Sequence, residues 1–218
     1  RVTAPLSYQS VDSRKEKSGT EMRSVWLLLG SLPSLLLMAC KGQNTADDYF
    51  FAGVELQKKG LMEEGLAKYD EAIRLDPSHA RAFGNRASTY NHLGQPERVL
   101  QDFGEAIRLA PDTSSFYGNR GQLFLNLGQT EQAIDDFNQA IKLSPEDAIA
   151  HYNRGFAHEL LGQPERAMHE YGEAIRLDPQ FAPSYVIRAR MKTRQGLDEE
   201  ALPDIARALE RASRLGRV

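Results

Sequence analysis

The sequence contains very little cysteine: one residue, Cys40, among 218. A single thiol cannot form an internal disulfide, and it is too few for a zinc finger or a thioredoxin-like redox pair. The chain also has no excess of charge of one sign, since 27 basic residues face 30 acidic ones and the formal net charge is −3. A near-neutral chain offers no electrostatic attraction to nucleic acid, so we expect no nucleic-acid partner.

Long hydrophobic runs are scarce as well. The one strongly apolar stretch extends from Val25 to Leu37 and is interrupted by Pro33. A membrane-spanning helix needs about 20 apolar residues, so this stretch is too short to span comfortably. It follows a basic residue, Arg23, and thus has the positive start and short apolar core of a secretory signal peptide. We therefore predict a signal peptide over 22–39, and a disordered segment, or one upstream of the true start, over 1–21.

The apolar stretch ends in the residues LMAC, with Leu37 three positions before Cys40 and the small Ala39 directly before it. This arrangement resembles the lipobox of bacterial lipoproteins. The resemblance implies that the chain is cleaved before Cys40 and that the thiol of Cys40 receives a lipid. Lys41, where an Asp would signal retention in the inner membrane, favours the outer membrane. An ordinary signal peptide or signal anchor with an incidental cysteine is the alternative.

The remainder of the chain repeats with a period of 34. One glycine, one alanine and one proline recur in each unit at fixed positions: Gly60, Gly94, Gly128, Gly162 and Gly196; Ala72, Ala106, Ala140, Ala174 and Ala208; Pro77, Pro111, Pro145 and Pro179. The period defines five units, which we number repeats 1 to 5: 46–79, 80–113, 114–147, 148–181 and 182–215. Residues 40–45 would form a short tether between the lipidated cysteine and repeat 1.

Each unit has the pattern of two helices, which we name helix A and helix B. In repeat 2, Phe83, Ala87 and Tyr90 recur at intervals of four and three residues, as on one face of a helix. The glycine that follows is expected to end helix A in the left-handed conformation. A proline such as Pro96 suits the first position of helix B. Pro203, inside the last helix B, is expected to cost about 3 kcal/mol.

The period and the two-helix pattern resemble the tetratricopeptide repeat over residues 46–215. The resemblance implies an all-α fold, a right-handed superhelical solenoid of about five helix–turn–helix units, with helices A lining the concave face. It also implies that the partners are other proteins or peptide segments. Repeat 5 lacks the closing proline, and a terminal repeat is expected to be atypical because it caps the stack.

The histidines and the absent catalytic motifs bear on enzymatic function. His151 and His158 share a helix face, but they take the positions that Tyr117 and Phe124 occupy in repeat 3, which favours a packing role over a metal site. No Gly-x-Ser-x-Gly, Walker loop or His-Glu-x-x-His motif occurs in the sequence. We therefore predict a protein that is not an enzyme and that uses no metal or cofactor.

Positions 7 and 23 of the unit change together. Repeats 2–5 have an arginine at position 7 and an acid at position 23, whereas repeat 1 has Ala52 and Lys68. This joint change predicts an ion pair between helix A and helix B in each of repeats 2–5. The predicted pairs are Arg86–Asp102, Arg120–Asp136, Arg154–Glu170 and Arg188–Asp204.

Position 6 of helix A is an asparagine in repeats 2, 3 and 4. In tetratricopeptide proteins this position faces the concave groove, and a carboxamide can donate to and accept from the backbone of an extended peptide. The resemblance thus implies a ladder of asparagines in a peptide-binding groove, with aromatic anchors at repeat 4 and basic residues at repeat 5. The predicted groove residues are Asn85, Ser88, Asn119, Gln122, Asn126, Tyr152, Asn153, Phe156, Arg190 and Arg194, with Asn91 and His92 beside them. The alternative is that the asparagines stiffen the repeats without a ligand.

Together these features predict a lipid-anchored adaptor or scaffold in the bacterial cell envelope, on the periplasmic face of the outer membrane, that binds an extended peptide segment. Two alternatives stay open: a structural module that self-associates as a homo-oligomer, and a pilotin-like assembly factor for a secretion or pilus system. An accessory role in polysaccharide export is a third.

Overall fold

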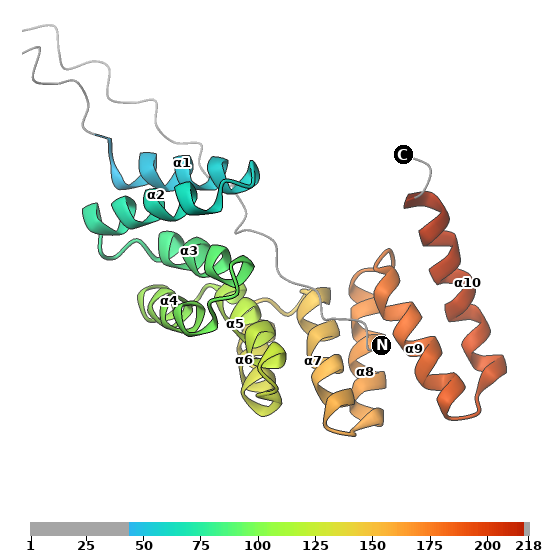
Figure 1. Ribbon diagram of the computed structural model, residues 1–218. Helices are drawn as coiled ribbons and strands as arrows, with labels where there is room; N and C mark the ends of the chain where they lie inside the picture. The colour runs from blue at the N-terminus through green and yellow to red at the C-terminus, as the bar shows by residue number, and fades with distance from the viewer. Residues whose placement is uncertain (1–43, 216–218) are drawn as a thin grey trace, which may run out of the picture.

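The computed structural model describes residues 44–215, and this part of the chain contains ten α-helices and no strand (Figure 1). The predicted signal peptide, Cys40 and residues 1–21 lie outside the described residues. The helices A are α1 (Ala46–Lys58), α3 (Ala80–His92), α5 (Ser114–Asn126), α7 (Ala148–Leu160) and α9 (Ala182–Arg194). The helices B are α2 (Met62–Leu75), α4 (Pro96–Leu109), α6 (Thr130–Leu143), α8 (Pro164–Leu177) and α10 (Asp198–Leu215). Each helix A begins at the first residue of a unit defined by the period.

Helices A and B of a repeat pack closely because small residues on one helix face an aromatic ring on the other. The rings at position 24 are Tyr69, Phe103, Phe137 and Tyr171, and each is at most 2% exposed. In repeat 3 the ring of Phe137 lies against Gly121, where an added Cβ would come within 2.9 Å of the ring. The distance between the two helices of a repeat is therefore set by the small glycine or alanine on helix A and the aromatic ring on helix B.

Each turn from helix A to helix B contains a glycine in the left-handed region. The φ angles of Gly60, Gly94, Gly128, Gly162 and Gly196 lie between 67° and 78°. A side chain at such a position is strained, and glycine is not. The prediction that these glycines end helix A is confirmed, and the same turn is reproduced in all five repeats.

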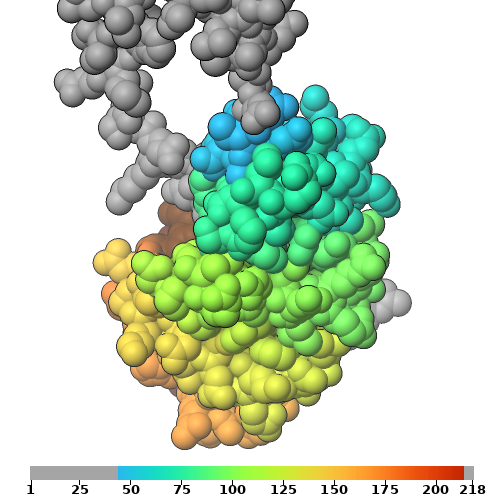
Figure 2. Space-filling view, turned by 90° about the vertical axis from the view of Figure 1, so that its left-hand side faces the viewer, coloured from blue at the N-terminus to red at the C-terminus, as the bar shows by residue number. Residues whose placement is uncertain are grey.

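The repeats are arranged in chain order along an arc (Figure 1), and the space-filling view shows the first three stacked from top to bottom on one side (Figure 2). Helix α1 contacts α3, α3 contacts α5, and α5 contacts α7, whereas no comparable contact joins successive helices B within residues 44–215. Since helices A lie closer together than helices B, helices A line the inner, concave side of the arc. The predicted all-α solenoid of five helix pairs is confirmed.

Helix α10 continues through Pro203 for 18 residues. A proline inside a helix has no N–H and pushes the preceding turn apart. Here Lys192 Nζ donates to the Glu200 carbonyl oxygen, at 2.9 Å, and so binds a carbonyl in the turn before the proline. The helix continues through the proline, and the bond from Lys192 ties the first turn of α10 to α9. No helix among residues 44–215 combines the length and the apolar character needed to cross a membrane.

Candidate functional site: the inner face of the helix A array

The inner face exposes only part of the predicted groove. Asn91, His92, Asn126 and Arg194 are exposed at the carboxyl-terminal ends of α3, α5 and α9. Ser88, Asn119 and Arg190 are half-buried, and the Ser88 hydroxyl donates to the carbonyl of Gly84 in its own helix. The accessible groove therefore follows the ends of helices A rather than their middle.

The continuous asparagine ladder predicted from position 6 is wrong for two of its three members. Asn153 is 0% exposed and Asn85 is 7% exposed. Asn85 Nδ2 donates to the Arg81 carbonyl one turn earlier in α3, at 3.0 Å. Buried carboxamides that bind their own surroundings stiffen the repeat, because leaving such a group unpaired in the interior is costly. Of the three, Asn119 alone is partly accessible.

The predicted aromatic anchors are also part of the core. Tyr152 is 2% exposed, and its ring centre lies 5.6 Å from that of Tyr171 and 5.3 Å from that of Phe181. Phe156 is 4% exposed and packs in a cluster with Leu125 of the preceding repeat. Tyr152 also shares a core cluster with Ile187 of repeat 5. Both rings are part of the core between adjacent repeats, so the expectation that they contact a ligand is wrong.

Gln122 belongs to the same buried layer. It is 5% exposed, and its Nε2 donates to Oδ1 of the exposed Asn126 one turn later, at 3.2 Å. The hydrogen bond from the buried Gln122 thus fixes the orientation of the Asn126 carboxamide. An oriented, exposed amide is a better hydrogen-bonding group for a ligand than a freely rotating one, because less rotamer entropy is lost on binding.

The basic groove at repeat 5 is not free. Glu159, on α7, lies between the two predicted arginines: Arg190 Nη2 donates to both of its carboxylate oxygens at 2.7 and 3.0 Å, and Arg194 Nη1 donates to one at 3.2 Å. The side chain of Arg194 is 65% exposed, whereas that of Arg190 is 27% exposed. Arg194 is therefore the cation that a ligand can reach.

Sequence reasoning missed Glu159, although a signal was present. Arg190 and Arg194 follow it by 31 and 35 residues, which are one period less three and one period plus one. Residues three and four apart share a helix face, so these offsets place both arginines opposite the acid on the next helix A. The Tyr171 hydroxyl also donates to Glu159, at 3.2 Å, and burial together with this carboxylate raises the pKa of Tyr171.

The four predicted ion pairs lie behind this face and join helix A to helix B. Arg120 donates from Nε and Nη2 to both oxygens of Asp136, at 2.8 and 2.7 Å. Arg86 with Asp102, and Arg188 with Asp204, repeat the same two-bond geometry. The carboxylates are between 4 and 7% exposed. Such shielded, bidentate pairs fix the angle between the two helices of a repeat.

Repeat 4 carries a variant of this pair, with a glutamate at position 23. Arg154 Nη2 donates to Glu170 Oε1 at 2.8 Å, and the other oxygen accepts from His151 Nδ1 at 2.8 Å. Burial would raise the pKa of Glu170, but the hydrogen bonds from His151 and Arg154 outweigh it and hold that pKa at about 2. His158 is hydrogen-bonded to Gln163, and burial lowers the pKa of His158. These histidines are packed into the repeat, and no group of three potential metal ligands occurs among residues 44–215.

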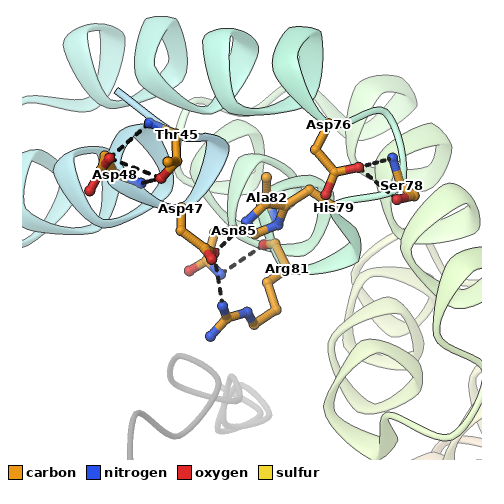
Figure 3. Close-up of polar contacts among 9 residues, drawn as sticks. All are labelled: Thr45, Asp47, Asp48, Asp76, Ser78, His79, Arg81, Ala82 and Asn85. Carbon is orange, nitrogen blue, oxygen red and sulfur yellow. Dashed lines mark hydrogen bonds and ion pairs between the residues drawn. The ribbon is translucent and has the colours of Figure 1, made fainter. Parts of the chain in front are cut away.

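The first repeat begins with polar contacts of its own (Figure 3). Thr45 and Asp48 form a capping box at the start of α1. His79 accepts from the Ala82 backbone N–H through Nδ1, at 3.1 Å, and its Nε2 lies 3.1 Å from Asp47 Oδ1. Arg81 Nη2 also donates to Asp47, at 3.2 Å. These bonds link the start of α1 to the start of α3 and anchor repeat 1 on repeat 2.

Three segments of the chain match models of known repeats. Residues 68–101 and 148–181 match tetratricopeptide repeat models, and residues 121–162 match a TPR repeat model. A comparison with curated proteins finds no match.

Solved structures with the same fold include several tetratricopeptide proteins. MamA from Desulfovibrio magneticus RS-1, solved from residue 41 to its end, is 20% identical with a TM-score of 0.70, over 78% of this chain and 97% of that one. YrrB, described as a TPR protein with an unusual peptide-binding site, is 20% identical with a TM-score of 0.64, over 82% and 92%. PilW, described as a widely conserved type IV pilus biogenesis factor, is 22% identical with a TM-score of 0.70, over 77% and 78%.

At these identities the likeness to solved structures is one of fold. The family matches lie in repeats 1 to 4, and the same period and the same helix pair extend through all five repeats. The three matched segments and the shared fold show that the chain carries tetratricopeptide repeats.

Proposed function

We propose that this chain is a membrane-anchored scaffold of the bacterial cell envelope that binds an extended peptide segment of a partner along its inner face. The observation that carries the proposal is the set of exposed polar and charged groups at the ends of three of the five helices A: Asn91 in repeat 2, Asn126 in repeat 3 and Arg194 in repeat 5.

The chemistry of these groups suits a peptide backbone. Each carboxamide offers two donors and an acceptor, and an exposed guanidinium can bind a carboxylate in a bidentate manner. One neutral hydrogen bond contributes only about 0.5–1.5 kcal/mol net. These carboxamides would therefore bind a peptide backbone with modest affinity and little sequence preference. Arg194 would favour a segment with an acidic residue or a free carboxylate at one end.

The inner face can be tested by site-specific photo-crosslinking in the native envelope. A photoreactive residue at Asn126 should capture partner protein, whereas the same residue at Gln139, exposed on α6, should not. The substitution Asn91→Ala/Asn126→Ala/Arg194→Ala should weaken partner binding at least tenfold and leave the helical circular dichroism signal unchanged. Capture from Gln139 alone, or full affinity in the triple variant, would move the binding surface away from helices A.

The anchoring part of the proposal rests on Cys40 and its lipobox-like surroundings, outside the described residues. Five residues, Lys41 to Thr45, separate Cys40 from the start of α1 at Ala46. At about 3.5 Å per residue such a tether reaches less than about 20 Å, so repeat 1 would lie next to the membrane. Cys40→Ser should release the protein into the soluble envelope fraction. Persistence of that variant in salt-washed membranes would contradict lipid anchoring.

The likeness to PilW does not by itself favour the pilotin-like alternative. MamA and YrrB resemble the chain to a similar extent and carry different descriptions. Partner capture at Asn126 distinguishes the alternatives, because a pilus or secretion component among the captured proteins would identify an assembly factor and a different envelope protein would identify another scaffold.

A further inference from the structure

The last helix has an apolar face that nothing covers among residues 44–215. On α10, Leu202 is 61% exposed, Ile205 41% and Leu209 65%. Leu209 and Leu202 are the two most exposed of the large hydrophobic residues in the described chain. The three residues are spaced by three and four, so they form one stripe along the helix.

The equivalent face of every other helix B is used for stacking. Ile205 takes position 24 of its repeat, where Phe103, Phe137 and Tyr171 are each at most 2% exposed. Leu202 takes position 21, where Ile134 and Met168 pack against core clusters. In repeats 1 to 4 this face is covered by the helix A of the next repeat. The stripe on α10 is therefore a stacking surface that lacks its counterpart in the described chain.

The opposite end of the array is closed to stacking by charge. Position 3 of helix A is buried and uncharged in repeats 2–5, as Ala82, Phe116, Ala150 and Ser184, and so is position 10, as Thr89, Leu123, Ala157 and Met191. In α1 the same two positions are Asp48 and Glu55, both exposed. If a second copy stacked head to tail, its α1 would carry these two carboxylates into the apolar contact. Within the described chain, Asp48 is bonded only to Thr45, and Glu55 only to the exposed Lys58. Taking these charges out of water costs more than such contacts return, so α1 is an unsuitable counterpart for the stripe.

The stripe is, by contrast, complementary to itself. The spacing of Leu202, Ile205, Leu209 and the exposed Ala212 is three, four and three, which is the seam spacing of packed helix pairs. In an antiparallel pair, Leu202 of one copy would lie opposite Leu209 of the other, with Ile205 near the two-fold axis. A two-fold axis produces a closed dimer, in which the same patch serves both copies.

Charge favours the same orientation. The first turn of α10 contains Asp198, Glu199 and Glu200. In its second half Arg207 is exposed, whereas Arg211 is 9% exposed and donates to the Pro179 carbonyl of its own chain at 3.2 and 3.0 Å. An antiparallel pair keeps the two acidic first turns apart and turns each toward the half of the other helix that carries Arg207, whereas a parallel pair would bring acid to acid.

We propose that the exposed face of α10 binds the α10 helix of a second copy of this chain, in an antiparallel, two-fold symmetric dimer. The inner face of helices A is left open in such a dimer, so two grooves would be presented by one assembly. The interface is confined to one helix from each copy, and an interface this small is expected to be weak, with a Kd on the order of micromolar. The proposal does not depend on the peptide-binding function.

The test uses the full chain carrying Cys40→Ser, so that lipid and a native thiol are absent. Sedimentation equilibrium over a concentration series should show a twofold rise in mass. Leu202→Glu/Leu209→Glu should abolish the rise, and Phe51→Glu, at an exposed position on α1, should leave it intact. Circular dichroism melting of each variant checks that the fold is retained. A monomer at every concentration, or association that Leu202→Glu/Leu209→Glu leaves unchanged, overturns the proposal.

Orientation is tested by a bismaleimide crosslink at single introduced cysteines. Ile205→Cys lies near the expected axis, so it should link to the same residue of a second copy. A mixture of Ile205→Cys and Phe51→Cys chains should give no link between the two different cysteines. Crosslinking of Ile205→Cys to Phe51→Cys in place of the symmetric product would demonstrate head-to-tail stacking and overturn the proposal.

Discussion

Repeat 1 and repeats 2–5 fasten helix A to helix B in different ways. Repeats 2–5 use a shielded arginine–carboxylate pair, but repeat 1 has Ala52 and Lys68 at these positions, and Lys68 Nζ lies 5.5 Å from the centre of the Tyr49 ring. In repeats 2 and 4 the arginine also reaches the preceding helix B: Arg86 Nη1 donates to Asp70 at 2.6 Å. In repeat 4, Arg154 Nη1 donates in the same way to Asn138 Oδ1, at 2.8 Å.

This comparison shows that the arginine at position 7 connects neighbouring repeats as well as the two helices of its own repeat. An arginine that touches its own helix B and the previous one fixes three helices at once. The described chain supplies no helix B before α1, so an arginine at position 52 would make only part of these bonds. The pair is therefore a property of the interior of the array, and its loss should be costly there and harmless at the end.

The largest effect is expected from breaking the pair that has no second partner. Asp136→Ala leaves the half-buried Arg120 without its carboxylate, and such a loss costs about 3–5 kcal/mol. Asp102→Ala should cost less, because Arg86 keeps Asp70. Lys68→Ala, in repeat 1, should cost under about 1 kcal/mol. Urea unfolding followed by circular dichroism gives all three values, and equal losses in repeats 1 and 3 would contradict the distinction between them.

The next effect depends on pH and belongs to repeat 4. The pKa of Glu170 is held at about 2 in the folded chain, below the ordinary value of 4.5. A lowered carboxyl pKa contributes stability above the ordinary value, and that contribution disappears as the pH falls toward 2. Glu170→Gln should therefore cost about 2–3 kcal/mol at pH 7 and nearly nothing at pH 2. Asp135→Asn removes a charge from an exposed position and should show no such trend in the same unfolding series.

A smaller effect separates two glycines that look alike in sequence. Gly121→Ala places a Cβ 2.9 Å from the Phe137 ring, so we expect a loss of about 1–3 kcal/mol from overpacking. Gly104, inside α4, has no atom within 4 Å of an added Cβ. Gly104→Ala should stabilise the chain by about 0.5–1 kcal/mol, because alanine favours the helix. Melting temperatures that shift in the same direction would refute this assignment of the close contact.

The smallest change in stability is expected when the ion pair is introduced into repeat 1. Ala52→Arg/Lys68→Asp gives repeat 1 the pair of repeats 2–5. Both positions are only half-buried, so we expect a gain of no more than about 1 kcal/mol. A gain as large as the loss from Asp136→Ala would mean that the pair acts within a single repeat and that the neighbouring helix B is irrelevant.

The period of 34 was sufficient to locate all five helix pairs, their glycine turns and the residues of the ion pairs. It could do so because each of these features lies within one repeat and depends on positions that recur. The joint change at Ala52 and Lys68 predicted the ion pairs for the same reason, because both members of one contact are replaced in the same repeat.

The depth of the groove could not be predicted in this way, because it depends on contacts between repeats. Position 5 is Gly118 in repeat 3 and Tyr152 in repeat 4. The tyrosine is buried because Phe181, the last residue of repeat 4, and Ile187 of repeat 5 pack around it. Asn153 is buried beside it, whereas Asn119 at the equivalent position is half-exposed. Periodicity identifies equivalent positions, but the size of the neighbouring side chains decides which of them reach solvent.

The junction between repeats 2 and 3 is held differently from its neighbours. The Phe116 ring fits against Gly84, and the side-chain hydrogen bond across this junction joins the Tyr117 hydroxyl to the Pro111 carbonyl in the turn. The other three junctions carry charged or amide side chains bonded from helix to helix. Apolar contact is non-directional, whereas a bidentate or amide bond fixes one geometry, so we expect α5 to shift on α3 more readily than the helices at the other junctions shift.

The array is therefore expected to bend more at the junction between repeats 2 and 3 than at the other junctions. Spin labels at Ala67, Gln101 and Asp135 occupy the same exposed position in repeats 1, 2 and 3. We expect the distance distribution between labels at 101 and 135 to be broader than that between labels at 67 and 101, and equal widths would show a uniformly stiff array. Asn91 lies in repeat 2 and Asn126 in repeat 3, so bending at this junction would change the distance between the two side chains that a bound peptide would meet.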